Sequence, residues 1–267
     1  MPTSHYPRII MATVLSGVSG AFYYKPAGTQ ATFGESDVTT GAGTSEINVG
    51  PNFNFKAGDP IKFNFRNTQD GSVGAGTLPA PLSAATTYYV LTYNSSTGAL
   101  TLSTSVGGAE VDLTDDGTIA APNRFEASYA SYAVVAEVRD WSLEISRSEI
   151  DVTTIGQAIG QYVPFRKYIS GFGDANGTAN VYMTDEDSAL ANRLVQDVLL
   201  RKQVGAGMKL YLERIESGGS VDDTKSRSIE MPVTLTSASL NVNPDDAQSV
   251  AINFRPSEAV SFDFSTT

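Results

Sequence analysis

The chain has 267 residues, 41% of them hydrophobic, which is enough for one large domain or two ordinary ones. It contains no cysteine and one histidine, His5, so the sequence argues against disulfides, thiolate metal sites and histidine-based catalysis in a folded core. Its 18 basic and 29 acidic residues give a net charge of −11, which argues against a protein that grips nucleic acid by neutralising phosphates.

The N-terminal residues 1–10 have no apolar run long enough for a signal peptide, and no segment approaches the ~20 apolar residues of a membrane span. We interpret residues 1–10 as an N-terminal extension, because Met11 could be the natural start. A β-rich stretch, Val14 to Tyr24, follows this extension. Because no apolar segment is long enough to span a membrane, the sequence predicts no membrane insertion by this chain.

A segment rich in Gly, Thr, Ser and Asn follows, and we expect residues 28–128 to form a small all-β domain. It would be inserted into a larger β-domain made of residues 11–27 and 129–267. A hairpin is expected where Tyr88 to Tyr93 and Ala99 to Leu102 are joined by a loop that ends in Gly98. The expected strands are Ile47 to Val49, Asn52 to Phe55, Pro60 to Phe65, Thr87 to Tyr93, Ala99 to Ser103 and Thr118 to Ala121.

The second half shows alternating strands, each with one apolar and one polar face. In the first of them Trp141, Leu143 and Ile145 alternate with polar residues, and we expect the strand to end at Ser146, before an acidic, Thr-rich loop. Such patterns favour an antiparallel β-sandwich or barrel over a parallel sheet. The expected strands are Val134 to Ser146, Lys167 to Phe172, Ala179 to Tyr182, Met208 to Ile215, Arg227 to Thr236 and Gln248 to Arg255.

One flanking α-helix is predicted after Thr184, a residue type that caps helices, because Asp185-Glu186-Asp187 would occupy the favourable first turn. Arg201-Lys202 would form the last turn, and Gly205 would stop the helix. The apolar stripe that packs this helix onto a sheet comprises Leu190, Leu194, Val195, Val198 and Leu199.

Fragments that look like catalytic or binding motifs fail on their context. The glycines of Gly171 to Gly177 precede a strand rather than a helix, so we assign them to turns. The acidic pairs and triplets lack the spacing of a calcium loop, and we assign them to turns and to the helix start. We therefore predict no catalytic, cofactor-binding or metal-binding residues, and no enzyme.

The order of these elements resembles the major tail tube protein (major tail protein) family of tailed bacteriophages. The matching segments are Trp141 to Ile145, Ile150 to Gly156, Arg166 to Thr178 and the helix. The expected insertion is similar to a small Ig-like β-module that recurs in phage structural proteins, through Phe55 to Pro60, Leu78 to Leu82, Thr87 to Val90 and Gly107 to Leu113.

The resemblance implies a virion structural protein, assembled in the host bacterial cytoplasm, whose hexameric rings stack into a hollow tail tube that conducts viral DNA without specific binding. Its partners would be further copies of itself and the terminator, the baseplate or tip, and the tape measure protein. An acidic lumen would let DNA slide, and residues outside 28–128 carry 14 basic and 19 acidic side chains, a net charge of −5. The inserted domain favours a tail without a contractile sheath.

The loop from Glu149 to Phe165 corresponds to the inter-ring contact of that family. The candidate contact residues are Glu149, Ile150, Asp151, Val152, Thr153, Thr154, Ile155, Gln157, Tyr162 and Phe165. Two alternatives stay open: another tube-like, baseplate or terminator component of a tail or injection system, and a β-rich adhesin that binds glycans through its tyrosines.

Overall fold

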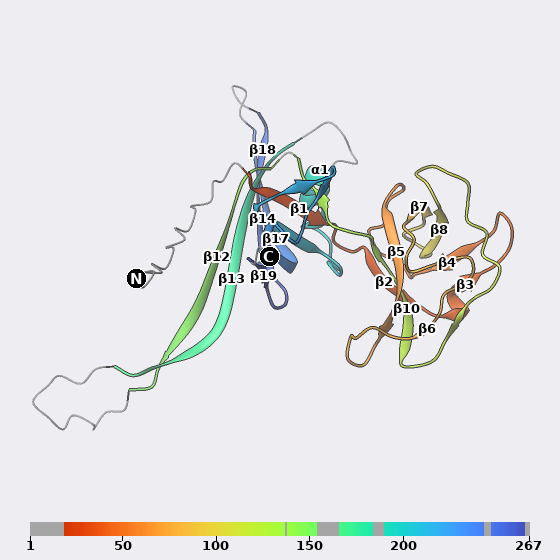
Figure 1. The fold of residues 1–267 in the computed structure, drawn as a ribbon, viewed down its shortest axis with the longest axis horizontal. Coiled ribbons are helices and arrows are strands. Elements are labelled where there is room, and N and C mark those ends of the chain that lie inside the picture. The colour runs from red at the N-terminus through yellow and green to blue at the C-terminus, as the bar shows by residue number, and fades with distance from the viewer. Residues whose placement is uncertain (1–18, 137, 154–165, 184–189, 243–246, 265–267) are drawn as a thin grey trace, which may run out of the picture.

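The computed structural model describes residues 19–136, 138–153, 166–183, 190–242 and 247–264. Within these ranges the chain is mainly β, with two large antiparallel sheets and one α-helix, so the predicted fold class is confirmed. Figure 1 shows the two sheets as separate bodies side by side, with the helix α1 (Leu190–Asp197) near their junction. No helix in the described part is long and apolar enough to cross a membrane.

The first sheet has the strand order β11-β1-β14-β17-β18-β13-β12, and an eighth strand, β19, also pairs with β17. A short hairpin, β15 (Glu216–Ser217) with β16 (Ser220–Val221), follows β14 in the chain. The eight strands are β1 (Ala21–Lys25), β11 (Ala133–Val134), β12 (Val138–Asp151), β13 (Tyr168–Tyr182), β14 (Gly207–Glu213), β17 (Arg227–Asn241), β18 (Ser249–Pro256) and β19 (Ser261–Asp263).

This eight-stranded sheet folds over its own core. The first half of β17 pairs with β14 and β19, whereas the second half pairs with β18, and the register shifts between Leu235 and Ser237. Such an irregularity bends a strand, so one strand can serve both layers of a sandwich. Both layers contribute buried apolar side chains to one cluster, among them Tyr24, Met208, Leu210, Met231, Val181, Ile252 and Phe254.

The helix packs against the same core, as its sequence predicts. Leu194 is fully buried, and Leu190, Val195 and Val198 are partly buried against the cluster. The assignment of Leu199 to the packing stripe is wrong, because the helix ends at Asp197 and a turn leaves Leu199 89% exposed. The expected cap at Thr184 and the acidic first turn lie outside the described residues.

The second sheet has seven strands in the order β2-β10-β5-β7-β8-β4-β3, over a separate aromatic core that includes Phe33, Phe63 and Phe125. The predicted β7–β8 hairpin is confirmed, and Gly98 has the positive φ of 88° that its turn requires. The strands are β2 (Gln30–Phe33), β3 (Val38–Thr39), β4 (Glu46–Asn48), β5 (Pro60–Asn67), β7 (Tyr88–Tyr93), β8 (Ala99–Ser103) and β10 (Asn123–Tyr129), beside a small β6 (Gly76–Thr77) and β9 (Thr118–Ile119) pair.

The expected strand from Asn52 to Phe55 is wrong. Asn52 has a positive φ of 63°, which does not fit an extended strand. The next two backbone N–H groups are used elsewhere, since Phe53 N donates to the Tyr93 hydroxyl and Asn54 N donates to the Gly28 carbonyl. This segment is therefore tied to other loops and not to a neighbouring strand.

The expected end of a strand at Ser146 is also wrong, because β12 continues to Asp151 and pairs with β13 along its whole length. The glycines of Gly171 to Gly177 lie inside β13 and not in turns. The space around Gly177 gives the reason, because a Cβ atom there would collide with the buried Phe254 ring. Glycine at this position lets a large side chain pack against the strand.

Candidate functional site

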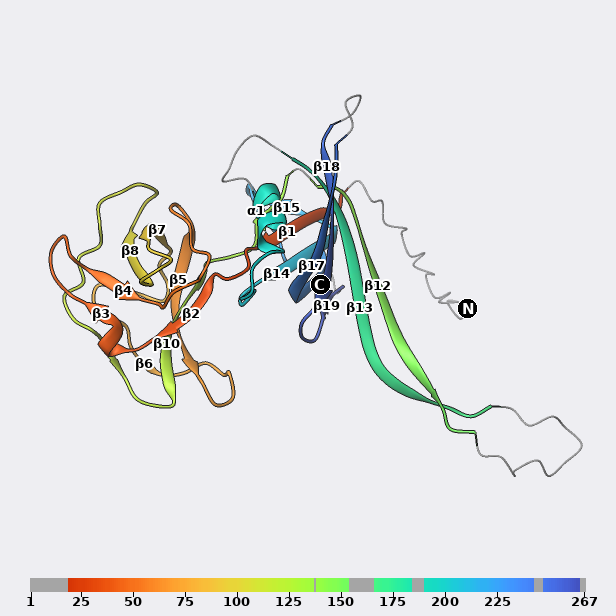
Figure 2. The same cartoon turned by 180° about the vertical axis from the view of Figure 1, so that it is seen from behind.

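The most prominent surface feature is a projecting β-arm, which we define as residues 144–153 and 166–176. The last pair between β13 and β18 is Gly177 with Phe254, so the strand from Tyr168 to Asn176 continues without β18 beside it. At about 3.3 Å per residue, these residues extend the arm by about 30 Å. Figures 1 and 2 show β12 and β13 leaving the sheet together and curving away from it.

The inner half of the arm has an apolar and a polar face. Ile145 lies opposite Ala175 on the face that continues from Trp141 and Leu143, and it is 55% exposed because the core ends before it. The other face carries the pairs Glu144 with Asn176 and Ser146 with Asp174. The apolar face of the sheet therefore continues into solvent.

The outer half begins at a register shift between Arg147 and Glu149, where two residues of β13, Gly171 and Phe172, face one of β12, Ser148. Phe172 lies in this irregularity and is 91% exposed. Beyond it, Ile150 and Ile169 are paired and both are about half exposed. A β-bulge bends a strand and turns its side chains, which matches the curve of the arm in Figure 1.

The predicted contact residues are only partly described. Glu149, Ile150 and Asp151 lie on β12, and Val152 and Thr153 follow it. Hydrogen bonds order the end of the arm, because Thr153 N donates to Asp151 Oδ1 and Lys167 N donates to Thr153 Oγ1. Hydrogen bonding to the Thr153 side chain and backbone also lowers the pKa of Asp151. The remaining candidates lie outside the described residues: Thr154, Ile155, Gln157, Tyr162 and Phe165.

Sequence reasoning missed the exposed apolar residues on the return strand of the arm. The strand predicted over Lys167 to Phe172 treats Tyr168, Ile169 and Phe172 as ordinary strand residues, yet all three are exposed. The sequence does contain a signal of this exposure, because these apolar residues stand among glycines and charged residues and do not follow a strict alternation.

In the part of the chain that the structure describes, no group of three or more histidine, cysteine, aspartate or glutamate side chains could hold a metal ion. Two of the acidic pairs contribute to turns, as expected. Asp115 Oδ1 accepts the backbone N–H groups of Ala80 and Gly117, and Asp222 Oδ1 accepts that of Thr224.

A second feature, which the sequence did not predict, is a buried polar junction between α1 and the seven-stranded side. The Asp197 carboxylate accepts hydrogen bonds from the Tyr24 hydroxyl at 2.7 Å, the Ala27 N–H at 3.0 Å and Asn54 Nδ2 at 2.7 Å. Burial raises the pKa of Asp197 and that of Tyr24. One turn earlier, Arg193 forms an ion pair with Asp59 at 2.6 Å.

The junction is closed by further contacts of the same helix and of the loop after it. Arg193 also donates to the Asn54 carbonyl and lies over the Tyr129 ring, whose pKa burial raises to about 12. The Gly28 N–H donates to the Val204 carbonyl at 2.9 Å. Gly28 has a φ of 72°, and a Cβ atom there would come within 3.1 Å of the Asn54 side chain. The two sheets are thus fixed to each other through buried contacts.

No protein-family model matches the sequence, and no curated protein matches it. Several solved chains show weak similarity, among them two from gene transfer agent particles. The first is the virion of a native gene transfer agent particle, at 16% identity and a TM-score of 0.36, covering 49% of this chain and 88% of that one. The second is the tail of an empty gene transfer agent particle, at 15% identity and a TM-score of 0.35, covering 50% of this chain and 87% of that one.

Proposed function

We propose that this protein is the structural subunit of a phage tail tube, in which hexameric rings stack through the β-arm. The observation that carries the proposal is the arm itself, a long two-stranded ribbon with exposed apolar side chains at Ile145, Ile150, Ile169 and Phe172. The resemblance of the sequence to tail tube proteins supports the same role. It is a non-enzymatic role that requires no cofactor.

Physical chemistry supports a protein partner for the arm. An isolated two-stranded ribbon is marginally stable in water, and its free edges and apolar side chains favour association. Because the arm extends beyond the body that bears it, it reaches a different surface on the next copy, and head-to-tail contacts of this kind propagate into open assemblies. A tube of stacked rings is such an assembly.

The remaining elements fit this proposal as follows. Residues 11–27 and 129–267 form the tube domain, residues 28–128 form an inserted domain that projects sideways, and residues 1–10 form an extension. Because the inserted domain extends from the side of the tube domain, a closely packed sheath would collide with it (Figure 1). We therefore propose a tail without a contractile sheath. The partners are further copies and the terminator, the baseplate or tip, and the tape measure protein within the virion.

Negative-stain microscopy of the purified chain tests this function. We expect hollow tubes of stacked six-fold rings, with a diameter that does not change with protein concentration. Rings that never stack would instead indicate a terminator or baseplate component. A chain that stays monomeric at high concentration would contradict the proposal.

The polar face of β12 and β13 is our candidate for the tube lumen, because Asp140, Glu144 and Asp174 lie on it among Ser, Thr and Asn residues. A carboxylate wall repels DNA phosphates, whereas a basic wall holds them. We expect tubes of the variant Asp140→Lys/Glu144→Lys/Asp174→Lys, assembled with short duplex DNA, to enclose DNA that resists nuclease.

The matched control is Glu46→Lys/Asp70→Lys/Asp116→Lys, which changes the net charge equally at exposed positions of the seven-stranded side. DNA bound to these tubes would lie outside and would be digested. Equal digestion for both variants, or a basic channel in a map of the wild-type tube, would show that this face does not line the lumen.

A further inference from the structure

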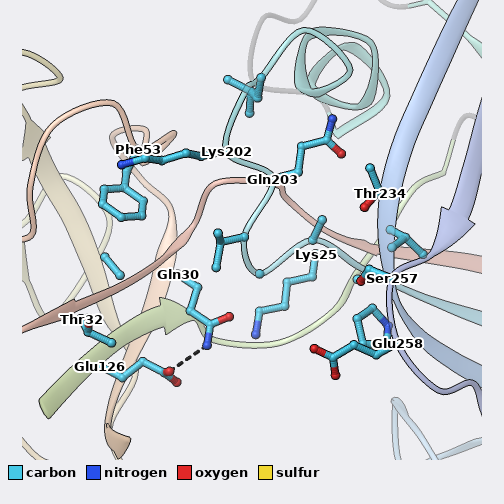
Figure 3. A pocket seen from close by; sticks show the side chains of 18 of the residues that line it. Lys25, Gln30, Thr32, Phe53, Glu126, Lys202, Gln203, Thr234, Ser257 and Glu258 are labelled. Atoms are coloured by element: carbon cyan, nitrogen blue, oxygen red, sulfur yellow. Dashed lines mark hydrogen bonds between the residues drawn. The ribbon is translucent and has the colours of Figure 1, made fainter. Parts of the chain in front are cut away.

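A cleft of about 960 Å³ lies between the two sheets, beside the buried junction. One wall comes from β2 and Phe53, and the other from the segment 200–207 after the helix and from Ser257 and Glu258 (Figure 3). Because the junction fixes both walls, the cleft is a preformed surface. Clefts of this size between structural units are common binding sites.

The cleft is locally basic in an acidic protein. Four basic residues line it, Lys25, Arg66, Arg201 and Lys202, against two acidic ones, Glu126 and Glu258; with the neighbouring Glu230 counted, the local excess is one positive charge in a chain of net charge −11. Glu126 is already engaged, since it accepts hydrogen bonds from Gln30 Nε2 at 2.7 Å and from Arg66 at 3.0 Å. The cleft therefore attracts anionic groups.

Lys25 is the most informative of these residues. It ends β1, is half-buried, and its side chain points into the cleft in Figure 3. Among the described residues its ammonium group makes no hydrogen bond or ion pair, although Glu126 and Glu230 lie near enough to act on it electrostatically. Burial lowers the pKa of Lys25. An ammonium group in such a place is stabilised by a hydrogen-bonding anion.

The wall formed by β2 offers a second kind of contact. This strand is at the edge of the seven-stranded sheet, and Gln30, Ala31 and Thr32 line the cleft. Edge strands present backbone donors and acceptors that an extended segment can pair with. An occupant that combines an extended backbone with carboxylate side chains would therefore match both the edge and the charge.

We infer that the cleft receives a carboxylate-bearing segment of the neighbouring copy within the ring. The inference rests on the proposed function, which brings copies of this chain into lateral contact. The charge balance of the chain favours a second copy as the occupant, because its 29 acidic residues outnumber its 18 basic ones, so one copy offers carboxylates to the basic cleft of another.

Zero-length carbodiimide cross-linking of assembled wild-type tubes tests the occupant directly. Tubes are assembled from an equal mixture of isotopically heavy and light copies, and linked peptides are identified by mass spectrometry. We expect Lys25 to be linked to an aspartate or glutamate of a different copy, seen as mixed heavy–light pairs. Lys225, which forms an ion pair with Asp222 at 3.0 Å in the same chain, serves as the control and should give no mixed pairs.

Charge reversal gives an independent readout. Lys25→Glu should raise the protein concentration needed for ring formation by at least about tenfold, because like charges would then meet in the contact. Lys25→Gln should weaken assembly less and reduce its sensitivity to salt, and Lys62→Glu, on β5 outside the cleft, should assemble as the wild type does. If Lys25→Glu fails to fold, the assembly of Lys25→Gln and the cross-links of the wild-type tubes still test the inference.

Two outcomes separate this inference from the proposed function. Normal tubes from both Lys25 variants, with Lys25 cross-links only within one copy, would overturn the inference and leave the tube function intact. A wild-type chain that forms neither rings nor tubes would overturn both.

Discussion

Removal of the outer half of the β-arm is expected to leave a folded protein that forms rings but no tubes. Residues 148–172 are replaced by Asn-Gly, so that a tight turn joins Arg147 to its partner Gly173. None of the described residues that are removed belongs to the hydrophobic core, so the free energy of unfolding should change by less than about 1 kcal/mol. Calorimetry measures the stability, and sedimentation and electron microscopy measure the assembly.

Point variants separate the loss of the apolar contact from the loss of length. Ile150→Asp/Ile169→Asp places charges on the paired, half-exposed positions, and we expect short stacks or single rings. The matched control, Ser148→Asp/Ser170→Asp, adds the same charges at exposed polar positions of the arm outside the candidate contact residues and should assemble more nearly as the wild type does. Tubes of normal length from the shortened chain would show that the arm does not join rings.

A mixture of the two proteins tests the direction of the contact. Shortened rings lack the outer half of the arm but keep the surface that receives it, so they should add to one end of a growing tube and stop it there. A small fraction of shortened protein is then expected to shorten wild-type tubes, as measured by their length distribution. Unchanged lengths would indicate that the receiving surface needs the arm of its own copy.

The sequence predicted most strands because their alternating faces are a local property. It misplaced the end of β12 because a strand continues wherever a partner pairs with it, and the partner of Ile150 is Ile169, beyond the intervening loop. The same limit applies to the strand expected over Asn52 to Phe55, whose backbone groups bond to distant loops. Leu199 was misassigned because the apolar stripe continues in the sequence after the helix has ended.

The buried junction was outside the reach of pattern reasoning for a similar reason. Arg193 and Asp197 are spaced four residues apart on a helix, which usually indicates a solvent-exposed charge pattern. In this fold each of them reaches a partner more than a hundred positions away in the chain, Asp59 and Asn54. Only the tertiary arrangement shows that these charged residues are buried between two sheets and hold them together.

Breaking this junction with a single substitution should strongly destabilise the protein. Arg193 and Asp59 have side-chain exposures of only 4% and 9%, so Arg193→Met leaves a buried carboxylate without its cation. Removing one partner of a buried pair costs about 3–5 kcal/mol. Arg66→Met is the matched control, since the Arg66–Glu126 pair has a 42% exposed arginine and should cost about 1 kcal/mol or less.

The double variant Arg193→Met/Asp59→Leu completes the test. Because both charges are removed together, we expect it to regain most of the lost stability. The substitution also removes Arg193 Nε, a buried polar atom that has no hydrogen-bond partner among the described residues and whose burial is therefore unfavourable. Urea unfolding followed by tryptophan and tyrosine signals measures the free energy of unfolding of each variant.

The two sheets have separate cores, so Arg193→Met should also split one unfolding transition into two, as the sheet around Phe63 and the sheet around Met208 unfold independently. A single transition at the wild-type urea concentration would show that the ion pair does not couple the sheets, and that backbone contacts such as Gly28 to Val204 suffice.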